Sequence, residues 1–361
     1  MTATPAPQTP GVYVGELSAF PPSVVGVATT LPCFVGYTES ASVNGKPVWL
    51  QPVAIGSLAQ FEEVFGRAFQ ARYAITEVPA GEAEHAHFKV WDPTGSPPAF
   101  RFYRLDVTSS FTLYNSMRLF YANGGRNCFV VSAGPYQKDG EPTPVAKDDL
   151  LAGLKAAGEQ VGPSMLVVPD AVLLPGDAGG RPWESAAFAE VVQAMLSQCD
   201  SRGDRVAILD VYGTGCLTPP AQDGATLDAV IGRFRQDVAD RGLSYGMAYF
   251  PFLEATVVAP GEVDFTNFEK APRGTAGVEQ LQQILSWENR NLYGDPAAPA
   301  NARAAAVQAN IDVMSTIFPA DRAGVRTLNS ALAADLPLLA EIEGLVARGE
   351  NVLPPSAAMA A

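Results

Sequence analysis

Four units of an amphipathic helix followed by a short apolar strand occur in series between residues 111 and 253. The strands are unbroken apolar runs, which is typical of strands buried on both faces, and each helix has one apolar face. We therefore predict an α/β fold with a doubly wound, mostly parallel sheet, in a core domain at 111–277. The units are Leu113–Tyr121 with Cys128–Val131, Asp148–Ala157 with Met165–Val168, Phe188–Cys199 with Val206–Leu209, and Leu227–Val238 with Met247–Phe250.

An extended arm is expected at 1–17. Residues 1–10 are rich in Thr, Pro and Ala and show no core-forming pattern, and the short β-type run Val12–Val14 follows between two glycines. A strand of this length is not stable alone. It must pair with a sheet edge, either in its own subunit or in another one.

The remaining segments predict three further parts. Residues 18–66 contain β-branched runs over 24–38 and a helix over 58–65 that begins at a capping Ser57. Residues 67–110 mix proline, glycine and aromatic residues, which indicates an inserted β-rich lobe. A helical C-terminal part is expected at 278–361, with helices at 278–287, 301–317 and about 327–347.

Composition excludes several classes of function. The 361 residues carry 24 Lys+Arg against 38 Asp+Glu, a formal charge of −14, whereas nucleic-acid binding needs clustered basic residues. The acidic balance also argues against docking on an anionic membrane. Only 17% of the residues are charged, against a typical ~25%. This indicates either an Ala- and Gly-rich globular enzyme or a subunit whose surface is largely covered by neighbours.

The expected location is a reducing compartment, without membrane insertion. No run of about 18 apolar residues is found, and the N-terminus lacks the basic and apolar regions of a secretory signal. The four cysteines are far apart and form no CxxC pair. Cys128 and Cys199 lie in apolar patterns, and we expect them to be buried as small hydrophobic residues.

Residues that could support ligand or metal binding are few. The fragments Asn123–Gly125 and Tyr212–Gly215 lack the spacing and context of a dinucleotide-binding loop, and we interpret them as a helix cap and a turn. His85 and His87 are the only histidines, and no third metal ligand follows at a fixed spacing. We therefore predict no cofactor and no metal site.

Asp170 and Asp210 each follow a predicted parallel strand, at the edge where such sheets bind ligands. A general base, a metal cluster and a phosphate loop are all missing beside them, so we interpret both as loop caps. The residues alone leave one alternative open, which is an α/β hydrolase or a nucleotide-dependent enzyme with a degenerate site near these carboxylates.

Five segments, in order along the chain, resemble contractile tail sheath proteins. The first resembles the family's PGVYVEE opening and consists of Pro10, Gly11, Val12, Tyr13, Val14, Gly15 and Glu16. The fourth has Phe252 where the family has Trp. Each motif alone is weak, but five in order over nearly the whole chain make the resemblance fairly specific. The other segments are Val25–Thr30 with Phe34–Gly36, Leu119–Gly125 with Cys128–Val131, Tyr249–Leu253, and Val352–Ala360.

The resemblance implies a structural protein and not an enzyme. In this family a central α/β domain, described as subtilisin-like, belongs to subunits that form stacked six-fold rings around an inner tube. Terminal arms add strands to neighbouring subunits, and contraction drives the tube through a target membrane. The implied partners are further copies of the chain, the inner tube protein, baseplate and terminal cap proteins, and paralogous sheath subunits. Assembly would take place in the bacterial cytoplasm.

Two features depart from the family pattern. The family normally continues for about a hundred residues past the motif at Val352–Ala360, into a region that contacts the tube. Residues 67–110 match no part of the family, and we expect them to form a lobe on the outer surface. Within the family, the helix end at Asn123–Gly125 and the compact layout favour an extracellular injection system over a phage tail.

Overall fold

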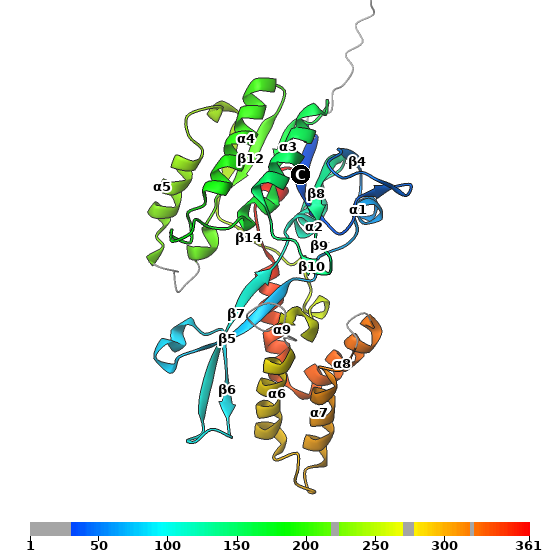
Figure 1. The fold of residues 1–361 in the computed structure, drawn as a ribbon, viewed down its shortest axis with the longest axis vertical. Helices are drawn as coiled ribbons and strands as arrows, with labels where there is room; N and C mark the ends of the chain where they lie inside the picture. Colours follow the sequence, from blue (N-terminus) through cyan, green and yellow to red (C-terminus); the bar gives the residue numbers. More distant parts are fainter. Residues whose placement is uncertain (1–29, 218–223, 270–277, 318–320) are drawn as a thin grey trace, which may run out of the picture.

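The computed structural model describes residues 30–217, 224–269, 278–317 and 321–361, and these form two units. Figure 1 shows the units end to end, with the mostly parallel sheet and its helices above and a smaller, mostly antiparallel sheet beside α6–α9 below. The expected arm at 1–17, including Pro10–Glu16, lies outside the described residues.

A six-stranded sheet forms the centre of the first unit, in the order β13-β12-β11-β1-β8-β4. Neighbouring strands run parallel except for β4, which is antiparallel to β8. The predicted α/β class with a mostly parallel sheet is therefore confirmed. The strands are β1 (Pro32–Thr38), β4 (Val53–Ile55), β8 (Cys128–Pro135), β11 (Met165–Val167), β12 (Val206–Asp210) and β13 (Gly246–Tyr249).

The central position of β1 corrects our domain boundaries. All seven residues of β1 are buried, because the strand has a neighbour on each side and helices on both faces. Residues 30–66, the described part of the range 18–66, are therefore not separate from the core at 111–277, since β1 and β4 complete the same sheet. We expected the sheet to begin only after residue 111.

Helices cover both faces of this sheet (Figure 1). On one face α3, α4 and α5 share a core cluster with Cys33, Val35 and Tyr37 of β1. On the other face α1, α2 and the short α10 share a cluster with Phe34. The five predicted helices of this unit are confirmed as α1 (Leu58–Phe65), α2 (Leu113–Ala122), α3 (Lys147–Glu159), α4 (Ala186–Arg202) and α5 (Leu227–Asp237). The short α10 (Ser356–Met359) was not predicted.

The second unit is a four-stranded sheet, in the order β15-β5-β7-β6, with four helices against one face. Its strands are β5 (Arg72–Val78), β6 (Phe88–Asp92), β7 (Ala99–Ser109) and β15 (Phe268–Glu269), and its helices are α6 (Val278–Tyr293), α7 (Ala302–Val313), α8 (Arg322–Asp335) and α9 (Pro337–Glu350). Two hairpins, β2 (Ser42–Val43) with β3 (Lys46–Pro47) and β9 (Gln137–Lys138) with β10 (Glu141–Pro142), lie in the first unit's loops.

Residues 67–110 are β-rich as predicted, but they share one core with the C-terminal helices. Ile75 and Leu105 of the sheet pack in the same cluster as Leu285 of α6 and Leu339 of α9. A small sheet with one apolar face needs such a cover. The segments 67–110 and 278–361, which we expected as separate parts, therefore build one unit. The helix expected at about 327–347 is two helices, because Pro337 ends one and begins the next.

The C-terminal residues return from the second unit to the first. After α9, β16 (Val352–Leu353) pairs with β14 (Leu253–Glu254), and α10 then packs under the parallel sheet. In Figure 1 the C-terminus accordingly lies within the upper unit.

Two helical glycines test how tightly the helix layer packs on β1. A methyl group added at Gly153 of α3 would lie 2.5 Å from Cγ1 of the fully buried Val35, whereas one at Gly232 of α5 would meet no atom within 4 Å. Gly153→Ala should lower the free energy of unfolding by about 1–2 kcal/mol despite the better helix propensity of Ala. Gly232→Ala should leave it unchanged or raise it by up to about 1 kcal/mol. Urea denaturation of both variants measures this, and equal effects would contradict the packing.

Candidate functional site

The carboxyl edge of the parallel sheet is the place where this fold would bind a ligand. β8 lies on one side of β1, and the next strand, β11, lies on the other side. The order in which strands are added to the sheet therefore reverses between β1 and β11. The crevice beyond such a switch point is the usual ligand site of open α/β sheets. The N-terminus of α2, the helix that precedes β8 in the chain, lies at this crevice. An N-terminus of this kind attracts phosphates and carboxylates.

The side chain of Asp170 fills this crevice. It is fully buried in η2 (Pro169–Leu173), directly after β11. Its Oδ1 accepts hydrogen bonds from the backbone N–H of Thr112 (2.7 Å) and Leu113 (3.1 Å) and from the Thr112 hydroxyl (2.8 Å). Its Oδ2 accepts from the N–H of Tyr37 at the end of β1 (2.7 Å). The protein's own carboxylate thus occupies the anion site at the start of α2.

Gly36 allows this close approach. A methyl group added at Gly36 would lie 2.6 Å from Asp170 Oδ2 and 3.1 Å from Leu113. Only a residue without a side chain therefore fits between β1 and the carboxylate. Gly36 is the glycine of the Phe34–Gly36 motif. Its packing against Asp170 explains why this position of the motif is a glycine.

Asp210 is bound in a similar way at the end of β12. Its Oδ1 accepts from the N–H of Ser356 (2.9 Å), and its Oδ2 lies 2.6 Å from the Ser356 hydroxyl. Burial raises the pKa of Asp210 to about 7, and the two hydrogen bonds from Ser356 oppose that shift. The interpretation of Asp170 and Asp210 as caps is confirmed, because each carboxylate satisfies backbone donors of a neighbouring segment.

The segments of the sheath resemblance meet at this edge. Phe34–Gly36 lies at β1, Tyr249 ends β13 beside Asp210, and Ser356 comes from the motif Val352–Ala360. The last two segments also pair directly, since Leu253 is opposite Leu353 in the β14–β16 ladder. Three of the five motif segments, distant in sequence, thus lie together in the structure.

The histidines have different surroundings. His87 accepts a hydrogen bond at Nδ1 from the N–H of Leu105 (3.1 Å), and burial lowers its pKa. His85 Nε2 lies 3.7 Å from Glu84 Oε1, at the surface. Within the described ranges, no group of three or more His, Cys, Asp or Glu side chains is placed to hold a metal ion.

Other predictions concern cysteines, turns and membrane spans. Cys128 and Cys199 are buried free thiols, as predicted, and so is Cys33. Asn123 caps α2, and Gly124 and Gly125 complete the turn, with the N–H of Gly125 donating to Phe120 O. None of the helices in the part of the chain that the structure describes is both long and apolar enough to cross a bilayer.

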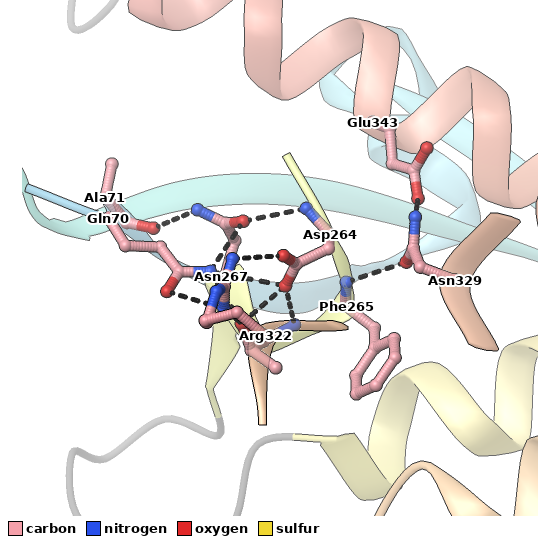
Figure 2. A network of polar contacts seen from close by, with 9 residues as sticks. Gln70, Ala71, Asp264, Phe265, Asn267, Arg322, Asn329 and Glu343 are labelled. Atoms are coloured by element: carbon pink, nitrogen blue, oxygen red, sulfur yellow. Dashed lines mark hydrogen bonds and ion pairs between the residues drawn. The ribbon is translucent and has the colours of Figure 1, made fainter. Parts of the chain in front are cut away.

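A polar network in the second unit was not predicted (Figure 2). Arg322 donates to Asp264 Oδ2 (2.6 Å), and Gln70 Nε2 donates to Thr266 Oγ1 (2.5 Å). Asn267 accepts from the N–H of Asp264 (2.9 Å) and donates to the carbonyl of Ala71 (2.7 Å). These contacts join the start of β5 to η7 (Phe265–Asn267) and to α8.

Asn329 extends the network to α9. It accepts from the N–H of Phe265 (3.0 Å) and donates to Glu343 (2.7 Å), as Figure 2 shows. Burial raises the pKa of Glu343 to about 7. Three of these bonds hold the main chain of Ala71, Asp264 and Phe265, which indicates a structural brace and not a substrate site. Polar residues at irregular spacing give no sequence signal for such a network, so only the fold reveals it.

Compared with known proteins, the chain matches no protein-family model and no curated sequence.

Asp170 and Asp210 should respond differently to loss of charge. In Asp170→Asn, one amide N–H₂ group must face a backbone N–H donor, so we expect a loss of about 3 kcal/mol in the free energy of unfolding at pH 6. In Asp210→Asn the amide can donate to the Ser356 hydroxyl, and the loss should stay below about 1 kcal/mol. Chemical denaturation of the two variants tests this, and a loss in Asp210→Asn as large as that in Asp170→Asn would contradict the assigned donors.

The raised pKa of Asp210 also predicts a pH dependence. Its ordinary pKa is 3.8 and burial raises it to about 7 in the folded protein. The group's contribution to stability is therefore fully present below about pH 4 and is lost as the pH rises through 7. The free energy of unfolding of the wild type should fall between pH 4 and 8, and Asp210→Asn should show a shallower fall. Parallel pH slopes for the two proteins would rule out this protonation.

Proposed function

We propose that the chain is a structural subunit of a contractile sheath, in an extracellular injection system or a phage tail. It would polymerise as stacked rings around an inner tube and re-pack when the sheath contracts. We assign the parallel sheet to the family's α/β domain that is described as subtilisin-like. The observation that carries the proposal is that three motif segments of the resemblance meet at the carboxyl edge and close it.

This closure supports a structural role over catalysis. In an enzyme of this fold the carboxyl edge would be open to a substrate. Here Asp170 binds β1 and α2, and Asp210 binds the C-terminal motif through Ser356. We therefore do not propose catalysis at these carboxylates. A nucleotide or metal ion that raised the melting temperature would favour the enzyme alternative instead.

The open edge of the parallel sheet supports self-association. No described strand pairs with the outer side of β13. Met247 and Ala248 of this strand are exposed, although they point to opposite faces, and Phe250 after it is exposed as well. The run from Gly246 to Leu253 contains no charged residue. Proteins usually protect such an edge with Lys or with a covering segment, so this one can accept a strand from another chain.

The arm supplies a matching donor. Val12–Val14 is a β-type run between glycines that needs a sheet edge, and we propose that it adds to β13 of a neighbouring copy. The low charged fraction of 17% is consistent with a surface that neighbours cover. The inner tube, the baseplate and the terminal cap would be the other partners.

Removing either half of this pairing should prevent assembly. We expect full-length protein to form rings or tubes in negative-stain microscopy, and the variant without residues 1–17 to stay unassembled with unchanged circular dichroism. Ala248→Lys should also stay unassembled, because a charged residue on an edge strand opposes strand addition. Ala99→Lys, at an exposed position on β7, is the matched control and should assemble. Polymers without the arm would rule out its role, and a full-length protein that stays monomeric at high concentration would argue against the sheath itself.

A further inference from the structure

The end of the chain, residues 337–361, crosses both units, and we call it the C-terminal strap. It consists of α9, β16 and α10. α9 supplies Leu339, Ile342 and Val346 to the core of the second unit, whereas Ala357 of α10 is buried in the core of the first. The strap is therefore part of both cores, and what holds it in place concerns the whole molecule.

Two carboxyl groups hold α9 against the other helices of the second unit. Glu288 of α6 accepts a hydrogen bond at Oε1 from the N–H of Leu338 (2.8 Å), in the first turn of α9. Further along, Glu343 of α9 accepts from the side-chain amide of Asn329 of α8 (2.7 Å), as Figure 2 shows.

Two more carboxyl groups hold the rest of the strap. At the end of α9, Glu350 accepts from the hydroxyl of Tyr73 of β5 (2.6 Å) and is also hydrogen-bonded to Ser110. At α10, the carboxylate of Asp210 binds the N–H and the hydroxyl of Ser356, as described above. The strap is thus attached at four points to four elements, which are α6, α8, β5 and β12.

Neutral groups supply all the hydrogen bonds at these four points. Within the described ranges, none of the four carboxyl groups forms an ion pair with Lys, Arg or His. Other buried carboxylates of the second unit do have such a partner, since Asp92 lies 3.2 Å from Arg101 and Asp264 lies 2.6 Å from Arg322. A carboxylate without a counter-charge is costly to bury, whereas a protonated carboxyl group is not.

The charged groups around the strap are acidic. Glu288 faces Glu341 of α9, and Glu343 faces Asp264. Glu262 of η6 (Pro260–Glu262), which also packs against α9, is paired with an arginine of α2. Ionisation of the strap's carboxyl groups therefore adds like charges to its surroundings, and no free cation among the described groups facing them offsets the repulsion.

Burial shifts all four carboxyl groups in the same direction. It raises the pKa of Glu288 and Glu343 from 4.5 to about 7 and that of Asp210 from 3.8 to about 7, and it also raises the pKa of Glu350. Their contribution to holding the strap is therefore fully present below about pH 4 and is lost as the pH rises through 7. Because four groups on one segment titrate together, this loss is steeper than for a single group.

We propose that the C-terminal strap is a pH-sensitive clasp, which binds both units while its four carboxyl groups are protonated and detaches when they ionise. Each ionisation releases one proton to the solvent. Detachment is local, because the core that β1 forms with α3, α4 and α5 contains no residue of the strap. This inference concerns the single chain and does not depend on the proposed function.

Hydrogen exchange of the monomeric wild type tests the clasp without any substitution. Amide exchange is followed by mass spectrometry at pH 5.5 and 8.5, with exchange times scaled for the intrinsic rate. Protection in α9 should fall at least about tenfold at the higher pH, and protection in α4 should change by less than about threefold. Equal protection of α9 at both pH values would overturn the inference. An equal fall in α4 would also overturn it, because the loss would then be global.

Neutral variants test whether these carboxyl groups cause the fall. Glu343→Gln combined with Glu350→Gln keeps an acceptor oxygen at both positions and removes two of the four titrations. The fall in α9 protection, on a logarithmic scale, should shrink by about half. Glu341→Gln, at the exposed glutamate of the same helix, is the matched control and should keep the full fall. Equal falls in the double variant and the control would overturn the inference, and the wild-type comparison decides it alone if the double variant does not fold.

Discussion

The buried carboxylate of Asp170 is the interaction on which the arrangement of the first unit depends. A charged group in the interior is tolerated only when its oxygens are fully hydrogen-bonded, and here the donors come from the end of β1 and the start of α2. One side chain after β11 thereby fixes two other elements. The same carboxylate also holds the point where the second unit joins the first. β7 of the second unit ends at Ser109, and α2 begins shortly afterwards at Leu113.

The two units are interwoven and not joined by a single linker. The chain passes from the first unit to β5, returns at α2, leaves again after β13, and returns through β16. The core of the second unit is therefore assembled from segments about two hundred residues apart, as the contacts of Ile75 with the α6–α9 cluster show. The last return matters most for function, because Ser356 brings the C-terminal motif onto Asp210.

The helices and strands of the core could be predicted from the sequence because their signals are local. An apolar stripe along Phe188–Cys199 specifies a helix by its period alone. The order of strands is not local, so neither the central position of β1 nor the shared core of 67–110 and 278–361 could be predicted from sequence alone. At the carboxyl edge, the positions of Asp170 and Asp210 after strands indicated caps, but the identities of their donors required the fold. The network around Arg322 gave no periodic signal at all.

The carboxyl edge of the parallel sheet and the outer side of β13 differ in how their hydrogen-bonding groups are satisfied. At the carboxyl edge the chain uses its own carboxylates and its own C-terminal motif, so no group is left for a ligand at Asp170. At β13 the reverse holds, since no described strand pairs with its outer side and the run from Gly246 to Leu253 carries no charged residue. A monomer gains nothing from exposing such a strand, because an unprotected edge invites aggregation. A second chain that covers the edge would remove this exposure, as in the proposed pairing of β13 with the arm of a neighbouring copy.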